Sequence, residues 1–484
     1  MISSELLMDF AGLSRSLGAV RLSFSGNIAL KGSSGSGFSS VSVDSRTLRE
    51  GALFVALAGS SGDGHCFVEA AFKAGAAAAM VESSKLEDCN LVDIAKAMGR
   101  ELLVVDNTLR GLQDAARVYL EQFPGLLKIG ITGSSGKSTT KEITAAIIRE
   151  EKNTVMNPGN LNSETGLPLS VFEVRPGHEA GVFELGMNRK GEIAELAAVL
   201  KPNIALITNI GSAHIGILGS KQAIAEEKKN IFSQFAGKGI ALIPEDDEFR
   251  DFLARGVRGR VCFYGAKSFG ELGEIRDLGL EGTEIRWGGE LIRFAMPGKH
   301  NLADAFAALA IAGELPVSRG AVKRGLEAAR PLFGRGEILR GRTMLIRDCY
   351  NANPESLREA VEFCDGLDWP GRRVYVIGDM LELGDNSRAA HERAGGLLAA
   401  SAADRVFLYG KETETAAGVM RAALEKGEGA VSFFHTGDMG ELSRALDAYV
   451  QNGDLVLLKG SRGCALEQLS GMLAGEAVEP EDTR

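Results

Sequence analysis

The chain has 484 residues, enough for about three domains of ordinary size, each able to bury its own core. Its formal net charge of -10 and its pI near 5.4 argue against nucleic acid or an anionic membrane as a general partner. The six cysteines form no CxxC pair, and the N-terminus has no signal-peptide pattern, so we expect reduced thiols in a cytoplasmic protein.

The first 106 residues combine strand-like stretches with one alanine-rich helix, predicted over 67–79. The predicted strands lie at 41–43, 53–57 and 102–105. The Gly/Ser tract at 32–40 predicts a mobile loop. Two polar turns, VDSR at 43–46 and GDGH at 62–65, follow apolar strands. These features predict a small α/β unit, in which either turn is more often structural than functional.

Residues 128–142 have the pattern of a phosphate loop. An apolar, β-branched strand leads into a glycine-rich turn and the first residues of a helix: Gly133, Ser134, Ser135, Gly136, Lys137, Ser138 and Thr139. In such a loop, backbone N–H groups and the helix N-terminus bind phosphate oxygens, the lysine reaches the outer phosphates, and the serine hydroxyl binds Mg2+. Ile131 stands where the strict GxxxxGK[ST] pattern has its first glycine. The sequence therefore predicts a nucleotide site without specifying the reaction.

A helix at 112–123 precedes this loop, and strands alternating with helices follow it. The predicted strands are 181–185, 204–210 and 239–243. This alternation predicts a mostly parallel sheet covered by helices on both faces, with ligands at the carboxyl ends of the strands. Polar clusters fall at those ends, at 157–164, 184–188 and 209–214. The apolar run 202–220 contains a histidine and several glycines, so we expect no membrane insertion.

Three residues of this region are candidates for a metal site, and a fourth, Lys228, shows no such sign by itself. Glu184 is the strongest, because a charge at the end of a buried strand is costly unless it meets a cation. Glu164 is weaker, since its turn resembles a helix cap. His214 follows an apolar strand in a Gly-rich loop, where a structural histidine is the more common role. Lys228 lies in a helical pattern whose charges are ordinarily solvated.

The pattern restarts near residue 315 and describes a second doubly wound sheet. Its predicted strands are 343–348, 373–378, 405–409, 431–434 and 454–458. No Gly-x-Gly-x-x-Gly occurs there, so we expect no dinucleotide. The acidic tail after Gly475 is predicted to be disordered.

Nine segments, in this order, resemble the Mur ligase family. They are TGSSGKSTTKE (132–142), GNLNSETGLP (159–168), ELGMNRKGEI (184–193), TNIGSAHIGILGS (208–220), EKKNIF (227–232), PGKHNLADAFAALA (297–310), DCYNANPES (348–356), GDMLELG (378–384) and LLKGSRG (457–463). The resemblance covers nearly the whole chain. It implies a small N-terminal α/β domain (1–106) for the UDP end of a substrate, a central ATPase domain (107–314), and a C-terminal Rossmann-like domain (315–484) that closes over the site.

The resemblance also implies a reaction. ATP phosphorylates the terminal carboxylate of UDP-N-acetylmuramoyl-tripeptide, an amine attacks the acyl phosphate, and phosphate leaves. The YNAN and GDMLELG motifs favour D-Ala-D-Ala as the amine substrate. We expect ATP and two Mg2+ ions as cofactors and a cytoplasmic monomer. Alternatives are a relative adding a single amino acid, a folate or cyanophycin ligase, and, from another class, a phosphate-loop regulatory ATPase.

Family positions imply roles for individual residues. Ser138 and Glu184 match ligands of a first Mg2+, and His214 and Lys228 match a second set in which Lys228 is carbamylated. Together with Lys137, the last two match catalytic positions. The ATP-binding positions are the phosphate loop with Asn301, Arg335 and Asp348. The substrate-binding positions are Ser45, Arg46, Asp63, His65, Asn160, Asn162, Asn351 and Asn353.

Five positions depart from the family pattern: Asn230, Asp304, Arg347, Cys349 and Gly463. None of them is a proposed metal ligand or the phosphate-loop lysine. The departures affect fine contacts, chiefly the support of Lys228. Lys229 beside it is the alternative position for the modified lysine.

Overall fold

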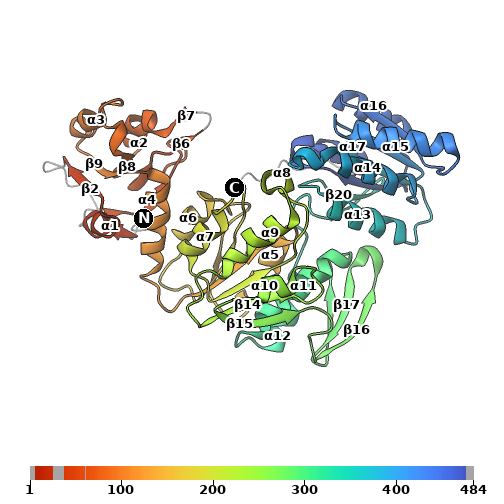
Figure 1. Ribbon diagram of the computed structural model, residues 1–484, viewed down its shortest axis with the longest axis horizontal. Helices are drawn as coiled ribbons and strands as arrows, with labels where there is room; N and C mark the ends of the chain where they lie inside the picture. The colour runs from red at the N-terminus through yellow and green to blue at the C-terminus, as the bar shows by residue number, and fades with distance from the viewer. Residues whose placement is uncertain (1–5, 25–36, 60–61, 476–484) are drawn as a thin grey trace.

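The computed structural model describes residues 6–24, 37–59 and 62–475. In Figure 1 the N-terminal sheet lies at one end of the molecule, the C-terminal sheet lies at the other, and the central elements join them. The chain is mixed α/β, as predicted, with parallel pairing dominant in its three large sheets. No helix within the described ranges is long and apolar enough to cross a membrane.

The N-terminal region is built on a five-stranded sheet in the order β2-β9-β8-β5-β4. Its strands are β2 (Val20–Ser23), β4 (Ser40–Ser42), β5 (Ala52–Val55), β8 (Ala78–Glu82) and β9 (Glu101–Val105). Its helices are α1 (Phe10–Leu17), α2 (Val68–Lys73) and α3 (Leu91–Met98). Two short pairs, β1 (Met8–Asp9) with β3 (Gly37–Phe38) and β6 (Ala58–Gly59) with β7 (Gly62–Asp63), complete it.

Two predictions for this region need correction. The helix predicted over 67–79 ends at Lys73, because Gly75 adopts a φ of 106° and the chain then enters strand β8. Ala78 and Ala79 are fully buried between β5 and β9, so tertiary packing overrides the helix propensity of alanine. Of the tract predicted to be a mobile loop, residues 37–40 belong mainly to β3 and β4. The rest of that tract lies outside the described residues.

Helix α4 (Thr108–Leu120) connects the N-terminal and central sheets. It begins four residues before the predicted start, because the Asn107 side chain accepts a hydrogen bond from the Arg110 N–H at 2.9 Å and caps the helix. Leu112 and Ala116 share one apolar core with Met80 of the N-terminal sheet and Phe183 of the central sheet. The two regions are therefore packed together along α4.

The central sheet has six parallel strands in the order β11-β12-β10-β13-β14-β15. They are β10 (Leu127–Thr132), β11 (Thr154–Met156), β12 (Ala180–Glu184), β13 (Ile204–Ile207), β14 (Gly239–Pro244) and β15 (Gly259–Tyr264). One face packs against α6 (Gly166–Val171), α7 (Glu192–Leu200), α9 (Lys221–Lys229) and α10 (Arg250–Ala254). The other packs against α5 (Lys137–Arg149), α11 (Lys299–Gly313) and α12 (Arg319–Ala328).

A three-stranded antiparallel sheet was not predicted. It consists of β16 (Leu272–Asp277), β17 (Thr283–Trp287) and β18 (Glu290–Phe294), and its Ile285, Ile292 and Phe294 pack into the core beside α5. Helix α12 packs into the same core through Val322 and Leu326. This packing favours a domain junction after α12 rather than at the predicted residue 314, and the three domain ranges remain predictions.

The C-terminal sheet has the order β19-β20-β24-β21-β22-β23. The five predicted strands are confirmed as β20 (Met344–Asp348), β21 (Arg373–Gly378), β22 (Arg405–Tyr409), β23 (Ser432–Thr436) and β24 (Leu455–Lys459). An antiparallel edge strand, β19 (Glu337–Arg340), was missed. The helices are α13 (Pro354–Gly366), α14 (Ser387–Ala399), α15 (Thr413–Lys426), α16 (Met439–Tyr449) and α17 (Ser470–Ala474). The predicted disordered tail lies outside the described residues.

Candidate active site

The phosphate loop lies between β10 and α5, at the carboxyl end of the central sheet. Gly133 and Gly136 adopt φ angles of 156° and 76°, in the region that favours glycine. A Cβ on Gly133 would lie 1.7 Å from Thr208 Oγ1. A Cβ on Gly136 would lie 2.1 Å from Asp304 Oδ1. Neither position has room for a side chain, so both glycines are required by the fold of the loop.

The end of the neighbouring strand β13 fixes the shape of this loop. Thr208 Oγ1 donates to the Ser135 carbonyl at 2.5 Å, and Asn209 Oδ1 accepts from the Ser135 N–H at 3.1 Å. Asn209 Nδ2 also donates to Ser135 Oγ at 2.9 Å. These contacts fix the shape of the loop that precedes the N-terminus of α5.

Two lysines converge on one carbonyl oxygen of the loop. Lys137 Nζ donates to Gly133 O at 2.9 Å, and Lys228 Nζ donates to the same oxygen at 2.7 Å. Lys228 is 1% exposed. Burial, reinforced by the charge of Lys137, holds the pKa of Lys228 well below its usual range. Burial also lowers the pKa of Lys137. The predicted catalytic residues Lys137 and Lys228 thus contact the same oxygen atom. Lys228 is buried against the phosphate loop and is not part of a solvated helix face.

Glu184 ends strand β12 and is 1% exposed. Its Oε2 accepts from Ser138 Oγ at 2.7 Å, and its Oε1 accepts from Asn162 Nδ2 at 2.6 Å. The predicted first metal pair is therefore in contact. A carboxylate, a hydroxyl and an amide meeting beside a phosphate loop are the hard oxygen ligands that Mg2+ prefers. This donor set fits Mg2+. Asn162, which was predicted to bind the substrate, contacts the Glu184 carboxylate.

His214 lies where the central and C-terminal regions touch. It precedes the short helix α8 (Ile215–Leu218) with a φ of 62°, and its Nδ1 is 3.0 Å from Glu382 Oε2 in the GDMLELG segment. Contact with His214 lowers the pKa of the Glu382 carboxyl. Nearby, Ser212 Oγ donates to Glu355 Oε1 at 2.6 Å. His214 thus faces a carboxylate of the C-terminal region in this structure.

A cleft of about 690 Å³ runs between the central and C-terminal regions. Most of the predicted ATP, metal and peptide positions line it: Ser134, Ser135, Gly136, Lys137, Thr139, Asn160, Asn162, Glu184, His214, Asn301, Arg335, Asp348, Asn351 and Asn353. The structure therefore brings together residues that are up to 219 positions apart, from Ser134 to Asn353. The cleft is lined by both regions, as a nucleotide bound between them would require.

The C-terminal wall of the cleft carries the other predicted ATP contacts. The Arg335 guanidinium lies 4.1 Å from the centre of the Tyr350 ring. Asp348 Oδ2 is 3.0 Å from Nζ of Lys459, which also donates to the Asn351 carbonyl at 2.7 Å. On the central side, Asn301 is 2% exposed and donates to the Pro297 carbonyl at 2.7 Å. Lys459 was missed, although the KGSRG segment contains it.

The predicted nucleotide-sugar residues lie apart from this cleft, in the N-terminal region. Arg46 has an 86% exposed side chain and pairs with Asp44, and Ser45 lies in the same turn. His65 has a fully buried side chain; its Nδ1 is 2.6 Å from Asp63 Oδ1, and its Nε2 accepts from the Glu82 N–H at 2.9 Å. Both ring nitrogens are occupied. His65 therefore supports the turn, and its contact with substrate remains a prediction.

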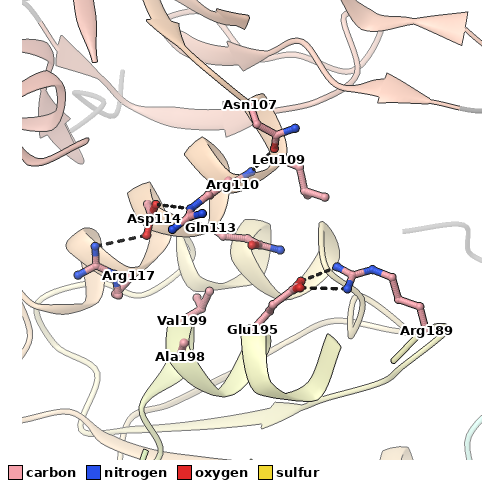
Figure 2. A pocket seen from close by; sticks show the side chains of 10 residues that line it. All are labelled: Asn107, Leu109, Arg110, Gln113, Asp114, Arg117, Arg189, Glu195, Ala198 and Val199. Carbon is pink, nitrogen blue, oxygen red and sulfur yellow. Dashed lines mark hydrogen bonds and ion pairs between the residues drawn. The ribbon is translucent and has the colours of Figure 1, made fainter. Parts of the chain in front are cut away.

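A second cavity of about 460 Å³ separates α4 from α7 (Figure 2). Arg189 projects into it from the loop before α7 and pairs with Glu195, and it also pairs with Glu164 at 2.6 Å. Gln113 of α4 donates to the Glu164 carbonyl at 3.2 Å. Arg189 was not among the predicted site residues. Its neighbour Asn188 lines the larger cleft, so this loop separates the two cavities.

Asp304 gives a prediction about pH. It is buried against the phosphate loop and accepts from Thr140 Oγ1 at 3.2 Å, and burial raises its pKa well above the usual range. The folded protein therefore keeps a proton that the unfolded chain loses, so stability falls as pH rises above the ordinary aspartate pKa. Asp304→Asn should stabilise the protein by about 1–3 kcal/mol more at about pH 8 than at about pH 5.

Urea unfolding at the two pH values checks this expectation. Asp251→Asn is the matched control, because the Asp251 side chain is 80% exposed. The control should follow the parent at both pH values. Equal shifts for Asp304→Asn at both pH values would show that Asp304 ionises normally.

Comparison with known proteins agrees with this geometry. The Mur ligase middle domain model matches residues 131–312, the model described as Mur ligase, glutamate ligase domain matches 334–462, and the model described as Mur ligase family, catalytic domain matches 38–119. The UDP-N-acetylmuramoyl-tripeptide--D-alanyl-D-alanine ligase of Treponema pallidum (strain Nichols) is 43% identical over 440 residues, covering 91% of this chain and 95% of that protein.

Two solved structures are similar over most of the chain. A MurF crystal structure from Acinetobacter baumannii superposes with a TM-score of 0.85 at 28% identity, covering 98% of this chain and 100% of that chain. The MurF ligase from Thermotoga maritima in complex with ADP superposes with a TM-score of 0.75 at 28% identity, covering 90% and 97%. The three matched segments, the 43% identity and the shared architecture together show that this chain belongs to the Mur ligase family.

Proposed function

We propose that the chain is an ATP-dependent ligase that joins D-Ala-D-Ala to UDP-N-acetylmuramoyl-tripeptide. The observation that carries this proposal is the cleft in which the phosphate loop, Glu184 and the segment before α13 face one another. The relative with 43% identity bears the name of this ligase, which supports both substrates. The product is the UDP-muramoyl-pentapeptide used in peptidoglycan synthesis. We expect a cytoplasmic monomer.

ATP is proposed to lie across the cleft. The N–H groups of 133–139 and the N-terminus of α5 would bind its phosphates, and Lys137 would exchange its contact with Gly133 O for the outer phosphates. Asn301 would contact the adenine, while Arg335 and Asp348 would reach the phosphates and ribose from the C-terminal side. The Thermotoga maritima MurF ligase is named as a complex with ADP, which supports the binding of an adenine nucleotide by this chain.

Ser138 and Glu184 are proposed to hold one Mg2+, and His214 and Lys228 a second. Bound there, Mg2+ would neutralise the phosphate charge and so allow a phosphoryl group to pass between two anions. A protonated lysine cannot bind a metal, whereas a carbamylated lysine offers the anionic oxygen ligands that Mg2+ prefers. The neutral Nζ of Lys228 would attack CO2 and lose one proton, forming a carbamate, and the low pKa of this buried amine favours the reaction.

The proposed reaction has two steps, phosphorylation of the peptide carboxylate and attack by the amine. The peptide carboxylate, oriented near Asn160 and Asn162, attacks the γ-phosphorus of ATP, giving the acyl phosphate and ADP. The D-Ala-D-Ala amine attacks the acyl carbon, and the tetrahedral intermediate releases phosphate and a proton. Asn351 and Asn353 lie on the facing wall of the cleft. Contacts such as Ser212 to Glu355 hold the two walls together and would exclude water from the acyl phosphate.

The nucleotide-sugar end of the substrate is proposed to lie over the N-terminal region. Ser45, Arg46 and Asp63 lie in the turns of that region, and the cavity of Figure 2 is lined by α4, which follows the N-terminal sheet in the chain, and by α7 of the central region. The muramoyl part would cross this cavity beside Arg189. Glu82 connects the His65 turn to α4, because its N–H donates to His65 Nε2 and its Oε1 accepts from the Thr108 N–H at the start of α4.

Arg189→Ala should therefore affect one substrate selectively. We expect KM for the UDP-muramoyl-tripeptide to rise about 10-fold to 100-fold, since a charge-assisted contact contributes about 1.5–3 kcal/mol. KM for ATP should stay within about twofold. Steady-state kinetics with each substrate varied in turn checks this. Arg388→Ala is the control, because the exposed Arg388 side chain of α14 pairs with Glu392 and does not line the cavity. A parallel rise in both KM values would contradict the assignment.

Phosphate release tests the function as a whole. With UDP-muramoyl-tripeptide and ATP, D-Ala-D-Ala should stimulate release, and single amino acids should not. Stimulation by one amino acid would favour a ligase that adds a single residue, or a folate or cyanophycin ligase. Release without any carboxylate or amine would favour the regulatory ATPase instead.

A further inference from the structure

A second lysine of the phosphate-loop helix has no place in the chemistry described above. Lys141 lies one turn after Lys137 on α5, yet its side chain is fully buried and points away from the cleft lining. Its Nζ donates to the Asn157 carbonyl at 2.7 Å and to the Gly159 carbonyl at 3.3 Å, and lies 3.3 Å from Glu142. Burying an ammonium group is costly unless its hydrogen bonds are satisfied, so this contact holds the start of the 157–162 loop firmly.

Asn157 carries the connection from that loop to strand β12. Its side chain is fully buried; Oδ1 accepts from the Glu184 N–H at 2.9 Å, and Nδ2 donates to the Glu184 carbonyl at 3.1 Å and to the Leu161 carbonyl at 2.9 Å. Because the two partners on Glu184 are a donor and an acceptor, only an amide side chain of this size satisfies both. Asn157 thus pairs with the backbone of Glu184 as a neighbouring strand residue would.

The 157–162 loop also forms a hydrogen bond with the Glu184 carboxylate. Asn162 donates to Oε1 at 2.6 Å, while Ser138 donates to Oε2 at 2.7 Å. The orientation of the carboxylate therefore depends on where the 157–162 loop sits relative to α5. Lys141 and Ser138 lie three residues apart on α5. The same helix therefore holds both the 157–162 loop, through Lys141, and the Glu184 carboxylate, through Ser138.

We propose that Lys141 and Asn157 are positioning residues that orient Glu184 for metal binding. Lys141 ties the loop to α5, and Asn157 ties the loop to the backbone of Glu184. Asn162 then directs the carboxylate. The inference rests on the proposed function only in assuming that Glu184 is a metal ligand. It assigns a role to two residues that do not line the cleft.

The test measures Mn2+ binding to the full chain in the presence of ADP, with electron paramagnetic resonance as the readout. Lys141→Met and Asn157→Asp should each weaken Mn2+ binding about tenfold, since lost support of a metal ligand typically costs 10-fold to 100-fold in affinity. ADP affinity without metal should change by less than about twofold, and Lys141→Arg should restore most of the Mn2+ affinity. Asn153→Leu is the control, because Asn153 makes an exposed side-chain contact with the Gly177 carbonyl at the opposite end of β11.

Glu184→Gln separates this inference from the proposed function. If Glu184→Gln leaves Mn2+ binding unchanged, the metal assignment fails. If Glu184→Gln abolishes binding while folded Lys141→Met and Asn157→Asp bind as the parent does, only the positioning role is overturned. If the variants do not fold, amide hydrogen exchange on the unaltered chain tests the positioning role of Lys141 and Asn157. The Glu184 amide should be strongly protected without ligand, and rapid exchange would contradict a preformed network.

Discussion

Lys228→Met should remove ligase activity by at least about a thousandfold and at the same time stabilise the fold. Activity is lost because methionine cannot form a carbamate. Stability rises because a buried polar amine is replaced by an apolar chain of similar length, for a gain of about 1–3 kcal/mol. Gly133 O keeps a partner in Lys137, so the change leaves no unpaired carbonyl. Phosphate release and urea unfolding measure the two effects.

Lys229→Met is the matched control for this prediction. Lys229 is the next residue on the chain, but its Nζ donates to the carbonyls of Phe252 and Arg255, at 2.7 and 2.6 Å, on the side facing α10. Its replacement should leave turnover within about threefold of the parent. Added bicarbonate should not rescue Lys228→Met. Near-normal turnover of Lys228→Met together with inactive Lys229→Met would show that the modified lysine is the neighbouring residue.

Lys137→Met should lower kcat by about 100-fold to 10,000-fold. The lysine supplies the positive charge nearest to the transferred phosphoryl group, and this charge matters most in the transition state. The ground-state affinity for ATP should fall less, because the backbone N–H groups of 133–139 remain. Single-turnover phosphate release and nucleotide-binding calorimetry separate the two quantities. Lys152→Met, at the far end of the same βαβ unit, is the control. A loss confined to ATP affinity would contradict a role in the chemical step.

The parts of the fold that were predicted correctly have strong local patterns. Strands such as β12 and β24 are buried on both faces and appear as continuous apolar runs, and the phosphate loop has its glycines and lysine in a fixed order. The sheet of β16–β18 was missed because five of the six residues of β16 are exposed and polar residues interrupt its pattern. Strand β8 was missed because its alanines resemble a helix until their burial is known.

In the site, too, residues with a local sequence pattern were predicted, and residues whose roles depend on tertiary contacts were not. Ser138 and Glu184 could be paired because both follow adjacent strands at the carboxyl edge of one sheet. Lys228 needed the family resemblance, since a helical run of charges gives no sign that one lysine turns inward. The substrate role of His65 likewise came only from the family resemblance, and its two ring nitrogens contact Asp63 and the Glu82 N–H. Arg189 pairs with Glu164 and Lys141 binds the Asn157 carbonyl, and these contacts between separate elements are not revealed by a local pattern.

The central claim is that the cleft directs ATP at a carboxylate. The most direct measurement uses UDP-muramoyl-tripeptide carrying a heavy-oxygen label in its terminal carboxylate, with ATP, Mg2+ and D-Ala-D-Ala, and mass spectrometry of the released phosphate. If the carboxylate is phosphorylated, one labelled oxygen passes into the phosphate when the amine displaces it. The account predicts labelled phosphate in step with pentapeptide formation. Unlabelled phosphate would mean that water attacks ATP, and it would contradict the account.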